Sequence, residues 1–184
     1  RANAMTIGNP LDNPDIGPMV SEGQLNDVLG YVKKGIEEGA TLVCGGERYT
    51  EGDCAKGYYM RPTIFDNCTP DMTIVREEIF GPVVTIQTFK TEEEAIALAN
   101  DTDYGLAGGV FTHQLERALR VVKEVRAGIT WVNAFNPTFN EAPWGGYKMS
   151  GIGRELGVHG LEEYQEIKQV NINLTPGPAG WYEH

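Results

Sequence analysis

Short β-rich runs alternate with amphipathic helical segments along most of the chain, and this alternation restricts the possible folds more than any other feature. Strands that are spaced by helices imply βαβ units. We therefore predict an α/β fold in which a mainly parallel sheet has flanking helices. The predicted strands are Thr41–Cys44, Tyr58–Phe65, Val83–Phe89, Leu106–Thr112 and Ile129–Val132.

Two of the predicted helices begin with a capping box, in which the first and fourth residues satisfy each other's backbone N–H groups. Ser21 and Gln24 form one box, and Thr91 and Glu94 form the other. Gly39 is predicted to end the first helix, whose apolar stripe consists of Leu25, Val28, Leu29, Val32 and Ile36. Gly128 is predicted to end a later amphipathic helix that carries Leu115, Ala118, Leu119, Val122 and Val125.

The length of 184 residues suits one domain, or one domain with a small appendage. A globular chain of this size can bury roughly 70% of its unfolded surface, so neither a disulfide nor a metal is required for stability. Residues 1–165 carry the alternating elements. Residues 166–184 carry a final predicted strand, Ile167–Leu174, and a tail rich in Pro and Gly.

The charge and the cysteines of the chain restrict its partners and its setting. The formal net charge is −11 at pH 7, and such a field repels nucleic-acid phosphates and anionic membranes. No apolar run approaches the length of a membrane span, and the first residues lack the apolar core of a signal peptide. The cysteines give no disulfide framework, so we predict a reducing, cytoplasmic setting for Cys44, Cys54 and Cys68.

The motif EEIFGP at residues 77–82 is the first candidate for ligand binding. A carboxylate such as that of Glu78 can accept hydrogen bonds from a sugar diol. A ring such as that of Phe80 can pack against a flat ligand. The alternative is a helix end with solvated acids and a Phe in the core.

The motif APWGGYKMSG at residues 142–151 is the second candidate. Glycines beside an aromatic residue let a loop approach a ligand closely. The indole face of Trp144 can attract a cationic head group by ~0.5–2 kcal/mol. The alternative is a structural turn in which Trp144 packs in the core. Asn133 precedes this loop, where it could orient a substrate group or only cap the loop backbone.

Several motifs of complete reaction centres are absent from the sequence. It contains no GxGxxG and no P-loop, and its three histidines lack the spacing of metal ligands. Cys44 follows a predicted strand, but neither a base nor a cation is evident beside it, which favours a buried thiol over a nucleophile. The local patterns therefore predict part of a ligand site without a complete set of catalytic groups.

Taken together, these motifs resemble the aldehyde dehydrogenase superfamily. The matching stretches run in the order of that superfamily across nearly the whole chain, and it is this ordered set that carries the resemblance. They are Gly8–Ser21, Glu38–Gly46, Met60–Phe65, Met72–Val84, Asn100–Thr112, Ala127–Asn133 and Pro143–Gly157.

The resemblance implies roles for residues in the first candidate motif. In the superfamily, the second Glu of EEIFGP binds the ribose beside the nicotinamide of NAD, and the Phe packs near the nicotinamide. Glu78 and Phe80 are therefore expected to bind this cofactor. The residue that matches Gln24 lies near the adenosine ribose in some members, so Gln24 is a third candidate for cofactor binding.

The sequence around Trp144 is similar to that of members that oxidise betaine aldehyde to glycine betaine. In those enzymes this Trp forms part of an aromatic box around trimethylammonium, so Trp144 is the expected substrate residue. Some of them bind a potassium ion through backbone carbonyls, for which Lys148 and Gly151 are the candidates. Aminoaldehydes and uncharged aldehydes remain alternative substrates, because an aromatic wall also packs apolar chains.

The resemblance also implies that catalytic groups are missing from this chain. The superfamily mechanism needs a Cys nucleophile, a Glu base and an oxyanion-hole Asn, followed by hydride transfer to NAD and thioester hydrolysis. All three groups lie upstream of the matching region. Residues 1–165 are therefore expected to be the C-terminal part of a catalytic domain, and the chain alone is predicted to be inactive.

The same resemblance assigns residues 166–184 to an oligomerisation strand and tail. Members of the superfamily are dimers or tetramers, so a homo-oligomer is expected. A rival from a different class is a non-catalytic scaffold protein that acts through this strand. The upstream coding sequence separates the two, because a Gly-Gln-x-Cys stretch there favours the enzyme and a true start near Met5 favours the scaffold.

Overall fold

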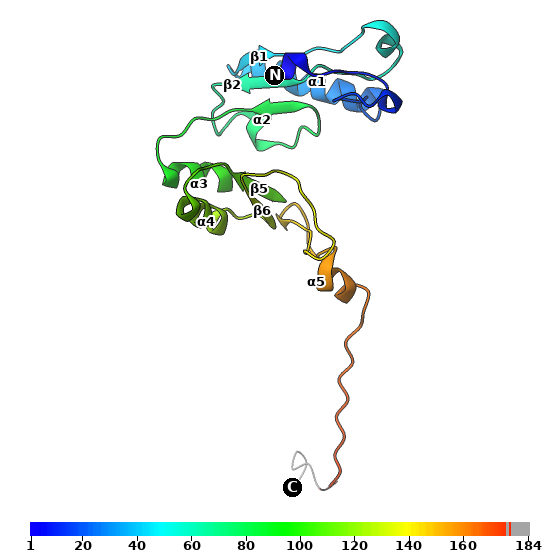
Figure 1. Ribbon diagram of the computed structural model, residues 1–184, viewed down its shortest axis with the longest axis vertical. Coiled ribbons are helices and arrows are strands. Elements are labelled where there is room, and N and C mark those ends of the chain that lie inside the picture. The colour runs from blue at the N-terminus through cyan, green and yellow to red at the C-terminus, as the bar shows by residue number, and fades with distance from the viewer. Residues whose placement is uncertain (176, 178–184) are drawn as a thin grey trace, which may run out of the picture.

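The computed structural model describes residues 1–175 and residue 177, in two halves that follow one another along the long axis (Figure 1). The first half contains α1 (Glu22–Glu37), β1 (Thr41–Cys44), β2 (Thr63–Asp66), α2 (Thr73–Arg76) and β3 (Val83–Thr85). The second half contains α3 (Glu92–Asn100), β4 (Tyr104–Gly105), β5 (Ala107–Val110), α4 (Leu115–Glu124), β6 (Ile129–Val132), β7 (Tyr147–Lys148) and α5 (Gly157–Glu162). Short 3-10 helices occur at Ala2–Ala4, Pro10–Asp12 and Gly52–Lys56.

The sheet of the first half has the order β1-β2-β3. Strands β1 and β2 are antiparallel, with Thr41 opposite Asp66, and a bulge shifts the register so that Cys44 lies opposite Ile64. Strands β2 and β3 are parallel, and α2 lies in the connection between them. The predicted strand Tyr58–Phe65 was too long at its start, because only an isolated bridge from Met60 to Arg48 precedes β2.

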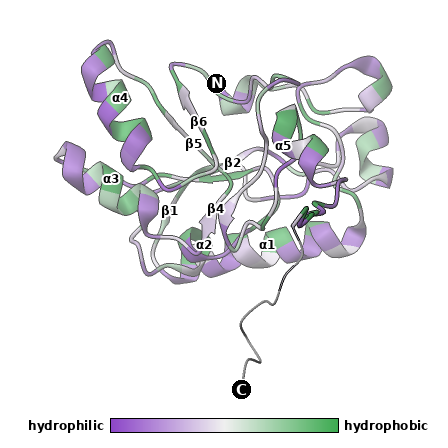
Figure 2. Ribbon diagram, turned by 90° about the horizontal axis from the view of Figure 1, so that it is seen from below, coloured by the Kyte–Doolittle hydropathy of each residue, from purple (hydrophilic) through white to green (hydrophobic). Residues whose placement is uncertain are grey.

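Helix α1 packs its apolar side on this half's core, and its ribbon in Figure 2 carries both hydrophobic and hydrophilic residues. Four of the five predicted stripe residues are buried or half-buried, but Ile36 is exposed. The neighbouring Gly35 is buried instead. It packs so closely on α2 that a Cβ there would lie 2.7 Å from Cδ1 of Ile74. The core cluster of this half comprises Leu25, Val28, Val32, Ala40, Met60, Phe65, Cys68, Met72 and Ile74.

The second half contains one βαβ unit, in which α4 connects the parallel strands β5 and β6. Helix α3 packs beside α4, and β4 pairs with β7 in a separate antiparallel ladder. Helix α4 ends at Glu124, four residues before the predicted stop at Gly128. Gly128 has a packing role instead, because a Cβ on it would overlap the carbonyl oxygen of Gly145 at 1.8 Å.

The prediction of a mainly parallel sheet was wrong. Residues 1–175 form one three-stranded and two two-stranded sheets, and two of the four strand pairings among them are antiparallel. The alternation of helices and strands misled the prediction because a loop with a short 3-10 helix, not a packed α-helix, connects β1 to β2. A connection of this kind allows the chain to reverse and pair antiparallel.

Both predicted helix starts were correct, but the reciprocal half of each capping box was not. The hydroxyls of Ser21 and Thr91 accept the backbone N–H groups of Gln24 and Glu94, each at 3.1 Å. The carboxylate of Glu94 accepts the backbone N–H of Lys90 at 2.7 Å rather than that of Thr91. The side chain of Gln24 makes a long-range contact that bears on the candidate site.

The predicted strand Ile167–Leu174 forms no ladder within the described part of this chain. Residues 166–175 extend away from the folded part, and Ile167 is fully exposed (Figure 1). A strand is defined by its hydrogen-bonded neighbour, and none of the described residues supplies one. The role of this segment in oligomerisation therefore stays a prediction, and most of the predicted tail lies outside the described residues. None of the helices in the described part is long and apolar enough to cross a membrane.

Candidate functional site

The EEIFGP motif forms a sharply turned segment between α2 and β3. Helix α2 ends at Arg76, and Glu77 has an extended backbone. Phe80 has a φ of +52°, in the left-handed region that disfavours non-glycine residues. The next residue, Gly81, has no room for a side chain, because a Cβ there would lie 2.7 Å from a methyl carbon of Val28 in α1. The turn therefore fits closely against α1.

Two hydrogen bonds from α1 hold this turn in place. The side-chain amide of Gln24 donates to the backbone carbonyl of Phe80 at 2.8 Å. The hydroxyl of Tyr31 donates to the Glu77 carboxylate at 2.8 Å, and this bond raises the pKa of Tyr31. Gln24 therefore holds the backbone of Phe80, which is also a predicted cofactor residue. This role was not predicted from the sequence. Tyr31 is an addition that sequence reasoning missed.

The side chains of Glu78 and Phe80 both point outward from this turn. The Phe80 side chain is 76% exposed, and Glu78 is exposed and makes no hydrogen bond within the described part of the chain. Gln24, Glu78 and Phe80 line one shallow groove together, with α1 residues that include Asn26 and Lys34. The structure thus brings the three predicted cofactor residues together. The alternative of a Phe in the core does not hold for Phe80.

Glu78 also borders a second cavity, of about 590 Å³, at the junction of the two halves. The other lining residues all belong to the second half and include Thr102, Tyr104 and Ser150. Glu78 therefore lies between the α1 groove and this cavity. A carboxylate in that position can accept hydrogen bonds from a polyhydroxyl ligand on either side.

Trp144 lies in an aromatic cluster next to a third cavity. Its ring centroid is 6.2 Å from that of Trp131 in β6, and Trp131 lies 5.3 Å from Phe135. The indole N–H of Trp131 donates to the backbone carbonyl of Pro137 at 3.0 Å, which holds the following loop. The backbone of Trp144 forms a two-way bridge with Glu155, with both N···O distances at 2.7 Å. Trp144 is half-buried, so it both packs and presents surface.

The Trp144 cavity and the Glu78 cavity adjoin each other. Both are lined by Leu106 and Ser150, so these two residues form the boundary between them. The hydroxyl of Ser150 accepts the backbone N–H of Gly105 at 3.0 Å, which fixes that boundary to β4. The cavity that Glu78 borders and the cavity that Trp144 lines therefore share two wall residues.

Lys148 is the last residue of β7, and Gly151 follows the tight turn after that strand. The Lys148 ammonium donates to the backbone carbonyls of Asn100 and Thr102, each at 2.9 Å. The backbone N–H of Gly151 donates to the Lys148 carbonyl at 3.4 Å, and Gly151 has a φ of +123°. The Lys148 side chain therefore caps the end of α3. Among the described residues, no cluster of His, Cys, Asp or Glu suits a metal ion.

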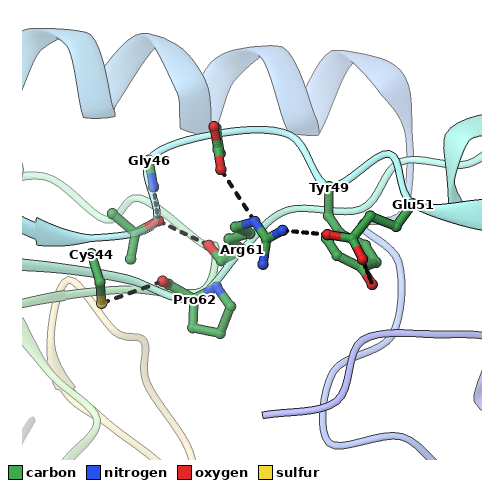
Figure 3. Close-up of polar contacts among 8 residues, drawn as sticks. Cys44, Gly46, Tyr49, Glu51, Arg61 and Pro62 are labelled. Atoms are coloured by element: carbon green, nitrogen blue, oxygen red, sulfur yellow. Dashed lines mark hydrogen bonds and ion pairs between the residues drawn. The ribbon is translucent and has the colours of Figure 1, made fainter. Parts of the chain in front are cut away.

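Two residues considered in the sequence analysis have structural roles. The side-chain amide of Asn133 accepts the N–H of Thr112 at 2.8 Å and donates to its carbonyl at 2.9 Å. These two bonds hold the backbone beyond the end of β5, rather than the backbone of the loop that follows Asn133. The thiol of Cys44 donates to the carbonyl of Pro62 at 3.8 Å (Figure 3). A backbone carbonyl cannot deprotonate a thiol, so this contact gives Cys44 no activation.

The chain has clear relatives among known proteins. Residues 1–170 match the aldehyde dehydrogenase family, and the chain belongs to that family. Within it, the chain is 49% identical to betaine aldehyde dehydrogenase of Bacillus subtilis over 99% of its own length and 37% of that protein. It is 51% identical to the chloroplastic betaine aldehyde dehydrogenase of Atriplex hortensis, over 91% of its length and 33% of the relative.

Solved structures of betaine aldehyde dehydrogenase from Staphylococcus aureus have the same fold. One complex with NAD+ superposes with a TM-score of 0.95 at 45% identity, over 100% of this chain and 37% of that one. A point mutant in complex with NAD+ gives a TM-score of 0.96 at 44% identity, over 100% and 38% of the two chains. The chain thus spans little more than a third of the length of these relatives.

Proposed function

We propose that this chain is the C-terminal part of an NAD-dependent enzyme that oxidises betaine aldehyde to glycine betaine. The observation that carries the proposal is the identity of 49% and 51% with betaine aldehyde dehydrogenases of two distant organisms. In the proposed enzyme, the nucleophile and the base come from the remainder of the protein. This chain contributes walls of the cofactor and substrate sites.

The proposed cofactor site is the groove on α1 together with the adjoining cavity that Glu78 borders. The Glu78 carboxylate would accept hydrogen bonds from the ribose hydroxyls beside the nicotinamide, and its exposure and lack of a partner among the described residues support this role. Phe80 would pack near the nicotinamide ring, and Gln24 near the adenosine ribose. Bound NAD would supply the hydride acceptor.

Trp144 is the proposed contact for the trimethylammonium group of the substrate. An indole face attracts a cation by ~0.5–2 kcal/mol, and more when water is excluded. The clustering of Trp144 with Trp131 supports the role, because a packed ring is held in one orientation before the substrate binds.

The experiment that tests this role compares betaine aldehyde with 3,3-dimethylbutanal, its uncharged isostere, in the full-length enzyme and in its Trp144→Leu variant. We expect Trp144→Leu to lower kcat/KM for betaine aldehyde by about two- to thirtyfold while the isostere is little affected. Leucine keeps an apolar wall, so equal losses for both substrates would show that Trp144 serves only as that wall.

An uncharged aldehyde or an aminoaldehyde is the second candidate substrate. The observation that favours it is the packing of Trp144 against Trp131, which also makes a wall for an apolar chain. For an enzyme of uncharged aldehydes the two aldehydes above would react alike. An aminoaldehyde carries an ammonium group, so for an enzyme of aminoaldehydes the aminoaldehyde would react faster than betaine aldehyde.

Two further proposals rest on the resemblance to the family. Backbone carbonyls of the turn that contains Lys148 and Gly151 are proposed potassium ligands, and a dependence of the melting temperature on potassium rather than sodium would test this. Residues 166–174 are proposed to pair between subunits in a dimer or tetramer, which the molar mass of the full-length protein tests. A non-catalytic scaffold would keep the assembly and show no aldehyde oxidation.

A further inference from the structure

One ion pair links the two halves of the chain. The guanidinium of Arg76, at the end of α2, makes a bidentate contact with the carboxylate of Asp101, with N···O distances of 2.9 and 2.8 Å. It also donates to the backbone carbonyl of Asp101 at 3.1 Å. Among the described residues, these are the only hydrogen bonds or ion pairs that join residues 1–89 to residues 91–175.

Asp101 belongs to a rigid junction at the end of α3. The side chain of Asn100 accepts the N–H of Arg126 at 2.7 Å and donates to the carbonyl of Glu124 at 2.8 Å. The Lys148 ammonium holds the carbonyls of Asn100 and Thr102. Through Asp101, Arg76 is therefore attached to α4 and β7 as well as to α3.

Glu78 is two residues beyond Arg76, and it faces this junction. It is the one described residue of the first half that lines the cavity between the halves, and the opposite wall includes Thr102 and Ser150. Its neighbours are fixed, since Tyr31 holds Glu77, Gln24 holds the backbone of Phe80, and Ile79 packs on the core. The width of this cavity then depends on the distance between Glu78 and the residues of the second half that line the opposite side.

We infer that the Arg76–Asp101 pair is a positioning device that sets the Glu78 carboxylate against the second half of the chain, and thereby the affinity for the ribose of the dinucleotide. The inference rests on the proposed function of Glu78. Arg76 and Asp101 act through Glu78 and are positioning residues. Three directed donor contacts fix the relative orientation of two planar groups, which a single point contact would not do.

The experiment measures KM for NAD+ and KM for betaine aldehyde in the full-length enzyme. Arg76→Asp and Asp101→Arg are each expected to raise KM for NAD+ by about two- to fivefold, because the pair is partly exposed and exposed pairs contribute modestly. KM for betaine aldehyde should stay unchanged. The double variant, which exchanges the two charges, should restore much of the affinity for NAD+.

Arg61→Asp is the matched control. Arg61 is exposed to a similar degree and pairs with Glu47 and Glu51 in the first half, away from the junction (Figure 3). This variant should leave both KM values unchanged. If Arg76→Asp proves too unstable to purify, Arg76→Gln and Asp101→Asn test the same contact without charge reversal.

Glu78→Gln separates failure of this inference from failure of the proposed function. If Glu78→Gln weakens NAD+ binding but neither Arg76→Asp nor Asp101→Arg does, the positioning role is overturned and the cofactor role of Glu78 stands. If Glu78→Gln leaves NAD+ binding intact, the cofactor role itself fails. Equal rises in both KM values, or a double variant worse than either single one, would show general damage and would also overturn the inference.

Discussion

At the scale of single residues, the closest backbone approach in the second half occurs at Gly128. A Cβ there would lie 1.8 Å from the carbonyl oxygen of Gly145, in the loop that carries Trp144. This residue lies between α4 and β6, so it brings that loop against the sheet. No side chain can be accommodated without moving one of these two backbone segments.

We predict that Gly128→Ala lowers the free energy of unfolding by about 1–3 kcal/mol or more, because the clash is with backbone rather than with a flexible side chain. Gly30→Ala is the control, since no atom lies within 4 Å of the added Cβ and Gly30 lies on the exposed face of α1. The control should be more stable by about 0.5–1 kcal/mol, because alanine favours helix. Chemical unfolding of both variants measures the difference. Equal stability of the two would contradict this account of Gly128.

The residues that we propose to face a ligand could be recognised from the sequence, and those that support them could not. Glu78, Phe80 and Trp144 are in short motifs whose chemistry is local. Tyr31 contacts Glu77 from 46 residues away, and Arg76 contacts Asp101 across 25 residues. No pattern at helical or strand spacing links such pairs, so only the folded structure reveals them.

At the scale of elements, α1 and α2 are joined by a carboxylate at the end of one helix and the start of the other. The Glu38 carboxylate accepts the backbone N–H of Thr73 at 2.7 Å and its hydroxyl at 2.6 Å. The hydrogen bonds from Thr73, chiefly that of its hydroxyl, and the nearby Lys34 lower the pKa of Glu38 below its ordinary value of 4.5. Glu38 thereby satisfies a donor at the α2 N-terminus that α2 itself leaves free.

This contact makes part of the stability dependent on pH. Because the folded state lowers the pKa of Glu38, the contribution is fully present above pH 4.5 and is lost as the pH falls through the folded pKa. We predict that Glu38→Gln unfolds at a lower temperature than the unmodified protein at pH 7 and that the difference shrinks as the pH falls below 4.5. Glu37→Gln, at an exposed neighbouring position, should behave like the unmodified protein. A difference that stays constant from pH 7 to well below pH 4.5 for Glu38→Gln would refute this role.

Helix starts and two strands were predicted well because their signals are local. The Ser21 and Thr91 caps open α1 and α3 as expected, and β1 and β6 have the predicted ends. The strand pairing was predicted wrongly as mainly parallel, since antiparallel or parallel arrangement depends on the path of each connection. The reciprocal hydrogen bond predicted for each capping box does not form, because the Gln24 side chain donates to the Phe80 carbonyl and the Glu94 carboxylate accepts the N–H of Lys90.

At the scale of the whole molecule, the chain is two small folded halves with a large apolar surface. Exposed apolar side chains include Phe111 and Leu115 around α4 and Val170 and Leu174 in the extended segment. Exposed apolar surface of this kind favours association with other protein surfaces. The chain matches little more than a third of its relatives, so the proposed enzyme has further protein to cover such surface.

We predict that the 184-residue chain alone oxidises no aldehyde with NAD+, because the family's nucleophile and base are expected upstream of it. The assay follows NADH absorbance with betaine aldehyde and purified chain, with full-length enzyme as the positive control. Turnover by the chain that Glu78→Gln or Trp144→Leu abolishes would overturn the prediction. Loss of that turnover on repurification would identify a contaminant.

We propose that the full-length enzyme is specific for an aldehyde that carries a trimethylammonium group. The most direct measurement is the ratio of kcat/KM for betaine aldehyde to kcat/KM for 3,3-dimethylbutanal, with NAD+ at saturation. We expect a clear preference for the cationic substrate, since the two differ only in charge at nearly equal shape. A ratio near one, or a preference for the uncharged aldehyde, would contradict it.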